Sequence, residues 1–109
     1  MSLERRILDA VTPVVPDCVA DRYTGDSDTY CTFNATELPA AIGDNAQHAI
    51  RYLVQLHYFS PFSSNPRSAK KRLRQALLSA GFTSPTVTPV DDDIDRHLVF
   101  EFEDVDGDV

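Results

Sequence analysis

Hydrophobic and polar positions alternate along several short segments of the chain. The clearest alternation lies in residues 48–60, where every second side chain from position 50 to position 58 is apolar or aromatic. This period of two predicts a β-strand with those side chains facing the core. Because the segment is longer than an average strand of about five or six residues, we expect part of it to project beyond its neighbours and to suit an assembly contact.

Three further segments also favour strands. Residues 29–36 alternate and are rich in β-favouring types, and residues 86–90 and 96–102 are two β-like runs joined by the acidic stretch DDDID. The last two runs predict a hairpin. Pro89 lacks an N–H donor, so the first of them is expected at the edge of the sheet.

Two segments carry a helical period instead. Residues 3–11 place their apolar side chains on one face after the N-cap candidate Ser2. Residues 66–80 follow Asn65 as N-cap, begin with Pro66 and end before Gly81, which favours the left-handed conformation that closes a helix. The core-facing stripe of this second helix is expected to contain two leucines and three alanines: Leu73, Leu77, Ala69, Ala76 and Ala80.

The remaining segments, residues 16–28 and 37–47, combine Pro, Gly, Asp and Asn with few periodic apolar positions, which is typical of loops. The predicted order is therefore helix, strand, strand, helix, strand, strand. We expect one α+β domain over residues 1–109, with a single sheet of about four mainly antiparallel strands and both helices packed on one face. Its core spans about residues 3–104, followed by a flexible acidic tail over residues 105–109.

Charged residues are distributed unevenly over the predicted helices and strands. The formal net charge is −7, yet five of the ten Lys and Arg residues lie in residues 65–82. At 100° per residue, three cations and one leucine fall together about 100–160° from the core stripe. These residues are Arg67, Lys71, Arg74 and Leu78.

Three interpretations of this basic face remain open. It is a solvated face with one exposed leucine, a surface for an acidic protein partner, or a nucleic-acid surface. Nucleic acid is the least favoured, because the net charge repels phosphate and no aromatic residues lie among the cations. Nine of the 17 acidic residues lie between Asp91 and Asp108, so a second copy of the chain could supply the acidic partner, with Asp91, Asp92 and Asp93 as its candidate contacts. A head-to-tail contact of this kind can close into a ring.

Motifs for catalysis or for metal binding are weak. The run from Asp91 starts like a calcium loop, but Arg96 and Phe102 stand where that loop needs Gly and Glu. His48 and His57 are expected on opposite faces of one strand. Cys31 and His57 could form a nucleophile dyad across adjacent strands, but a buried, reduced, structural thiol is favoured, as it is for Cys18. With no glycine-rich phosphate loop either, we expect no enzyme activity, no cofactor and no metal.

Neither a membrane-spanning run nor an export signal is expected, since the longest apolar run is interrupted and the N-terminal segment is charged. This predicts a protein made in the cytoplasm.

Taken together, the first helix and the segments TYCTFNATE, RYLVQLHYFSP, NPRSAKKRLRQALLSAGF and TVTPVDDDIDRHLVFEFED resemble the tail-completion proteins of tailed bacteriophages. This family includes the lambda-type tail terminator, and its members are also described as minor tail or head–tail joining proteins. The resemblance covers about residues 3–104. It implies a non-enzymatic phage or prophage structural protein, monomeric in solution, that forms a hexameric ring in the virion.

Such a ring would assemble in the host cytoplasm, contact the tail-tube protein and the head connector, and let DNA pass through its lumen without sequence-specific binding. The alternative is a small intracellular protein-binding or regulatory module of similar shape, and an enzyme with an unrecognised site ranks third.

Overall fold

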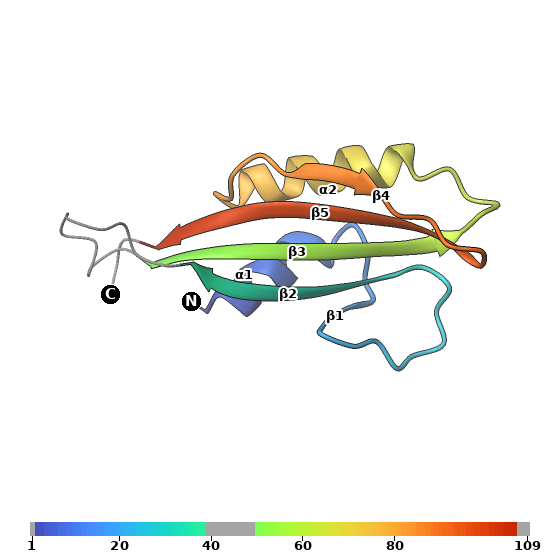
Figure 1. Cartoon of the computed structure of the whole chain (residues 1–109), viewed down its shortest axis with the longest axis horizontal. Helices are drawn as coiled ribbons and strands as arrows, with labels where there is room; N and C mark the ends of the chain where they lie inside the picture. Colours follow the sequence, from blue (N-terminus) through green and yellow to red (C-terminus); the bar gives the residue numbers. More distant parts are fainter. Residues whose placement is uncertain (1, 39–49, 107–109) are drawn as a thin grey trace.

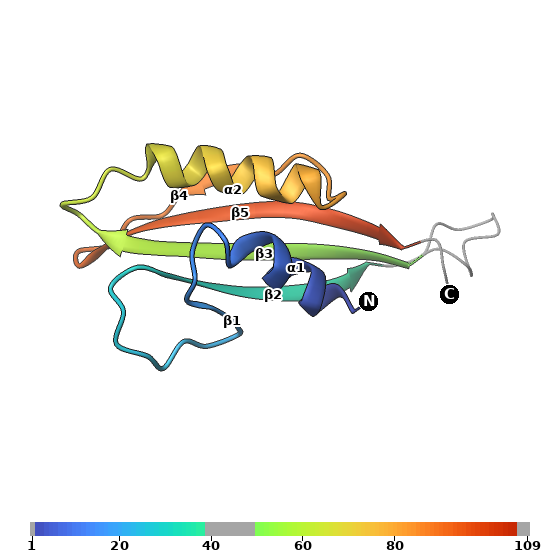
Figure 2. The same ribbon diagram turned by 180° about the vertical axis from the view of Figure 1, so that it is seen from behind.

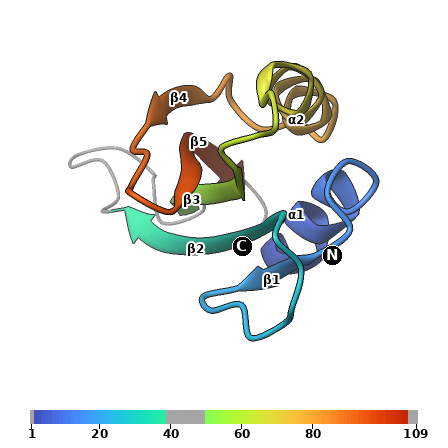
Figure 3. The same ribbon diagram turned by 90° about the vertical axis from the view of Figure 1, so that its right-hand side faces the viewer.

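The computed structural model describes residues 2–38 and 50–106, in which five strands form one sheet beside two helices (Figure 1). The elements in chain order are α1 (Leu3–Val11), β1 (Cys18–Ala20), β2 (Tyr30–Leu38), β3 (Ile50–Pro61), α2 (Arg67–Ser79), β4 (Thr86–Pro89) and β5 (Asp95–Asp106). Both helices lie in front of the sheet when it is seen from behind (Figure 2), and the end-on view places them on the same side of it (Figure 3). The predicted α+β class with both helices on one face is therefore confirmed.

The strands lie side by side in the order β1-β2-β3-β5-β4. Strands β4 and β5 form the predicted hairpin, and β4 with Pro89 lies at the edge as expected. All pairs are antiparallel except β1 and β2, which run parallel. The predicted number of about four strands is one too low.

The additional strand, β1, lies in residues 16–28, which were expected to form a loop. Its three residues are too few to show an alternating pattern. Backbone hydrogen bonds attach it to β2, since the Cys31 N–H donates to the Asp17 carbonyl at 2.8 Å and the Asp21 N–H donates to the Phe33 carbonyl at 2.8 Å. Asp21 then adopts a φ of 65°, and the chain leaves the sheet there.

The expectation that the long strand projects beyond its neighbours is wrong. All twelve residues of β3 pair with β5, and residues 51–59 also pair with β2. Strand β5 reaches Asp106, inside the segment expected to be a flexible tail, and so covers the whole length of β3. The predicted loop 37–47 begins within β2, and its residues 39–47 lie outside the described residues, as does His48.

The core lies between the sheet and the helices. Val54, Leu56 and Tyr58 face it from β3, as the alternating pattern predicted, and Ile50 is described only in its backbone. Tyr52 is half-buried. The other fully or nearly buried apolar side chains from the two helices and β5 are Ile7, Val11, Leu73, Leu77, Leu98, Phe100 and Phe102.

The helix ends follow the predicted signals with one difference. Ser2 caps α1, since its Oγ accepts a hydrogen bond from the Arg5 N–H at 3.1 Å. The N-cap of α2 is Pro66 rather than Asn65, because the helix begins at Arg67, one residue later than the sequence predicted. The Asn65 side chain nevertheless accepts a hydrogen bond from the Arg67 N–H at 3.0 Å. Gly81 has a φ of 94° and closes the helix as expected.

Candidate assembly surface

The outer side of α2 carries the predicted basic face. We call Arg67, Lys71, Arg74 and Leu78 the basic flank; all four are exposed, and Leu78 is 46% exposed. On the inner side, Leu73 and Leu77 are fully buried, because a helix that lies on a sheet turns one stripe inward. None of the three cations of the basic flank forms an ion pair with another residue of the described ranges.

The candidate acidic contacts lie in the turn between β4 and β5. The Asp92 carboxylate accepts hydrogen bonds from the backbone N–H groups of Asp95 at 2.7 Å and Ile94 at 2.8 Å. These two donors lower the pKa of Asp92, Asp95 having the larger effect. Asp91 accepts from the His97 backbone N–H at 2.9 Å. The turn is therefore ordered by its own carboxylates, and Asp93 is exposed beside them.

The sequence suggested one acidic surface for the acidic residues beyond position 90. In the structure the described ones do not form a single surface. Strand β5 separates them along its length, and alternation sends them to both faces. Glu101 and Glu103 lie on the face without helices, where they contact Gln55 and Arg51. Asp104 lies on the helix side and is buried. Among the side chains described, the compact acidic group of this region lies in the turn and consists of Asp91, Asp92 and Asp93, with Asp95 next to them at the start of β5.

This acidic turn lies beside the start of α2, at the right-hand end of Figure 1. Arg67 and Asp91 line one hollow of about 340 Å³ together with Lys70 and Arg96. The structure thus brings the first residue of the basic flank close to the acidic turn within one chain. The other members, Lys71, Arg74 and Leu78, continue along α2 away from that end.

The sheet face without helices carries a row of aromatic rings that the sequence interpretation missed. Tyr23 stacks on Tyr30 with ring centres 4.3 Å apart, Tyr30 on Phe59 at 4.8 Å, and Phe59 on His97 at 4.1 Å. Tyr30, Phe59 and His97 are direct cross-strand neighbours on β2, β3 and β5. His57 Nδ1 lies 2.8 Å from His97 Nε2 and extends the row. The signal in the sequence was the set of odd-numbered positions in residues 48–60, which includes His57 and Phe59 and which the alternation places on the side opposite the core.

The suggested dyad of Cys31 and His57 does not form. Cys31 pairs with Tyr58 and is buried on the helix side, whereas His57 pairs with Thr32 on the opposite face. Burial raises the pKa of both thiols, to about 12 for Cys18. Both cysteines are free and buried, as expected of structural thiols.

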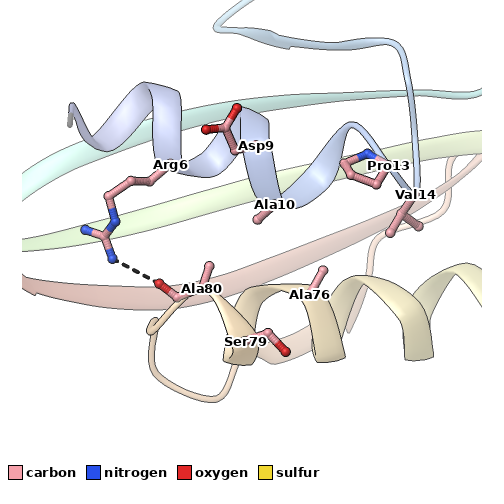
Figure 4. Close-up of a pocket in the computed structure, with 8 residues that line it drawn as sticks. All are labelled: Arg6, Asp9, Ala10, Pro13, Val14, Ala76, Ser79 and Ala80. Atoms are coloured by element: carbon pink, nitrogen blue, oxygen red, sulfur yellow. Dashed lines mark hydrogen bonds between the residues drawn. The ribbon is translucent and has the colours of Figure 1, made fainter.

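A groove of about 520 Å³ separates α1 from α2 (Figure 4). Small side chains line it from both helices, among them Ala10, Ala76 and Ala80. The Arg6 guanidinium closes one end and donates to the Ala80 carbonyl at 3.2 Å. The groove exists because the alanine side chains on the facing sides of α1 and α2 are too small to fill the space between the two helices.

Within residues 2–38 and 50–106, neither helix has the length and apolar character needed to cross a bilayer. No group of three or more His, Cys, Asp or Glu side chains in residues 2–38 and 50–104 is arranged to hold a metal ion.

Comparison with known proteins supports the fold. No family model matches the sequence, and no curated protein matches it. Among the solved structures that match is a protein whose name states no function. It shares 16% sequence identity over 94% of this chain and 88% of its own, with a TM-score of 0.62. At this identity the similarity shows a common α+β fold.

Proposed function

We propose that this protein is a non-enzymatic structural subunit of a tailed phage or prophage that acts in tail completion or head–tail joining. Identical copies assemble into a ring, and the basic flank of α2 contacts the acidic turn of the next copy. The ring binds the tail-tube protein on one side and the head connector on the other.

The observation that carries the proposal is the position of Leu78, an exposed leucine among three exposed cations on the outer side of α2. Leu78 is already about half covered within the chain, so burying the rest of its side chain in a contact contributes about 1 kcal/mol. The surrounding Arg and Lys side chains favour an acidic partner and orient it. An apolar centre with an arginine-rich border is a common composition of protein interfaces.

The proposed contact is heterologous, because the two surfaces differ. The basic flank runs along a helix, whereas the acidic turn of Asp91, Asp92 and Asp93 lies at one end of the sheet. Each copy can therefore offer one surface to each neighbour, which is the requirement for a closed ring. Arg67 lines the same hollow as Asp91 of its own chain, so a substitution there could also change contacts within one chain. Arg74 and Leu78 are therefore the positions to change.

The test is the double substitution Arg74→Glu with Leu78→Asp. We expect a folded protein by circular dichroism that forms no rings on purified tail tubes in electron microscopy and does not complete tails in a complementation assay. The control, Arg72→Glu with Gln75→Asp, makes the same change in charge at exposed positions of α2 outside the flank. Normal assembly of the first variant, or equal failure of both, would contradict the proposal.

A further inference from the structure

We propose that His57 and His97 form a binding site for one divalent transition-metal ion, of the Cu²⁺ or Ni²⁺ type, on the sheet face without helices. The proposal does not rest on the assembly function, although Asp91 and Asp92 of the acidic turn lie beside His97. It rests on the two imidazole nitrogens that face each other across β3 and β5, His57 Nδ1 and His97 Nε2, at 2.8 Å.

The backbone holds these two side chains in place. His57 pairs with Val99 and His97 pairs with Phe59, so the histidines are diagonal neighbours in a continuous antiparallel ladder. The ring of Phe59 stacks on His97 with centres 4.1 Å apart and restricts its rotation. The two histidine rings have centres 5.0 Å apart and are tilted by 40°. A metal ion would thus find two ligands on adjacent strands already close together, and no backbone movement is needed to bring them to it.

The hydrogen bond between the rings shows that a lone pair is already present at the site, because one of the two facing nitrogens must accept it. Neutral imidazole has one N–H and one lone pair, and a metal needs the lone pair. Binding replaces the hydrogen bond between the rings: the shared proton moves to the outer nitrogen of its ring, and the two rings turn so that both lone pairs meet at the ion.

The ligand type selects the class of metal. Imidazole nitrogens suit the divalent ions of the later transition metals, and Cu²⁺ binds most tightly among the divalent metals of the series. The 2.8 Å between the nitrogens is the length of their hydrogen bond. Once the rings have turned, two metal–nitrogen bonds of about 2.1 Å require a separation of about 3.0 Å at a right angle and about 3.4 Å at a tetrahedral angle. The smaller displacement leads to the right angle of square-planar and octahedral sites, the geometry of Cu²⁺ and Ni²⁺.

Charge also favours a cation at this place. Glu101 lies near His57, and Asp91 and Asp92 lie near His97, close enough for each to raise the pKa of its histidine against the effect of burial. Both imidazoles are half-buried on a face that no helix covers. The remaining coordination positions of the ion are therefore open to water.

The test is titration calorimetry of the whole chain with Ni²⁺, which has no redox reaction with the cysteines, in a buffer without chelators. We expect one ion per chain, and a loss of affinity of roughly tenfold or more in His57→Gln and in His97→Gln, since removing a group that merely orients a ligand already costs about 10–100-fold. His48→Gln, which changes the third histidine, should keep the wild-type affinity. Mg²⁺, which prefers oxygen ligands, should not bind there.

A second measurement does not depend on the variants folding. The electron paramagnetic resonance spectrum of Cu²⁺ bound to the unchanged chain should show coupling to two imidazole nitrogens. Absence of saturable Ni²⁺ binding, one ion per two chains, a spectrum with a single nitrogen, or equal loss of affinity in His48→Gln would overturn the two-histidine site.

Discussion

The Arg6 guanidinium holds the Asp104 carboxylate across 98 positions of sequence, with Nη1 lying 2.9 Å from each of its two oxygens. The Asp104 side chain is only 5% exposed. Arg6 also donates to the Ala80 carbonyl at the end of α2 and lies over the ring of Phe82 at 4.7 Å. One side chain of α1 thus connects α2 and β5 at the end of the domain where the three elements meet.

Replacing Arg6 with Met should destabilise the protein strongly. The Asp104 carboxylate would stay buried without its partner, and the Ala80 carbonyl would lose a donor. We expect the free energy of unfolding to fall by about 2–3 kcal/mol, measured by urea denaturation. Arg5→Met is the control, because both side chains of the Arg5–Asp9 ion pair are exposed to solvent. Such a pair contributes at most about 0.5 kcal/mol to the free energy of unfolding. Equal decreases in the free energy of unfolding in both variants would show that the buried Arg6–Asp104 pair contributes no more to stability than the exposed pair.

Phe100 is the largest fully buried side chain of the core. Truncation in Phe100→Ala removes its contacts and leaves a cavity, so we expect a loss of about 3–5 kcal/mol in unfolding free energy, or failure to fold. The matched control is Ile94→Ala, since Ile94 is 77% exposed and its truncation should change stability by less than about 0.5 kcal/mol. An unchanged melting temperature in Phe100→Ala would contradict the position of residue 100 in the core.

Gly81 closes α2 with a positive φ of 94°. A Cβ added there would meet only the Arg6 guanidinium, at 3.8 Å, so space is not limiting. The cost of Gly81→Ala is therefore a backbone cost of about 1–3 kcal/mol, measured by thermal unfolding. Gly81→Asn should cost less, because asparagine tolerates left-handed conformations better than alanine does. If alanine were as stable as glycine, or more stable than asparagine, the assigned backbone conformation would be wrong.

The histidine pair should make stability depend on pH. Burial lowers the pKa of His57 and His97 below the ordinary value of 6.5. Below pH 6.5 the unfolded chain therefore binds protons that the folded chain does not, so the free energy of unfolding decreases as the pH falls from 6.5 towards the folded-state values. Glu101, Asp91 and Asp92 act against this shift but do not reverse it.

Urea denaturation between pH 7.5 and pH 5 in the presence of a chelator measures this effect. The double variant His57→Gln with His97→Gln should show a shallower decrease than the unchanged chain, because the two depressed pKa values are gone. His48→Gln serves as the comparison. Identical pH profiles for the unchanged chain and the double variant would rule out a depressed pKa at the pair.

Much of the architecture could be predicted from local pattern. The period of two in residues 48–60 identified Val54, Leu56 and Tyr58 as core-facing, and the helical period in residues 66–80 placed Leu73 and Leu77 inward and Leu78 outward. These properties depend on the spacing of neighbouring side chains, so they can be read before any long-range contact is known. The assembly role of the basic flank stays a prediction.

The rest depended on contacts between distant segments. Strand β1 has three residues and exists because β2 pairs with it. The row from Tyr30 to His97 depends on the register of three strands, and the burial of Asp104 depends on Arg6 at the other end of the chain. The sequence by itself determined the elements and their inward faces, because periodicity is local. Only the tertiary structure decided which side chains meet across the sheet, because register and packing join residues that the chain keeps far apart.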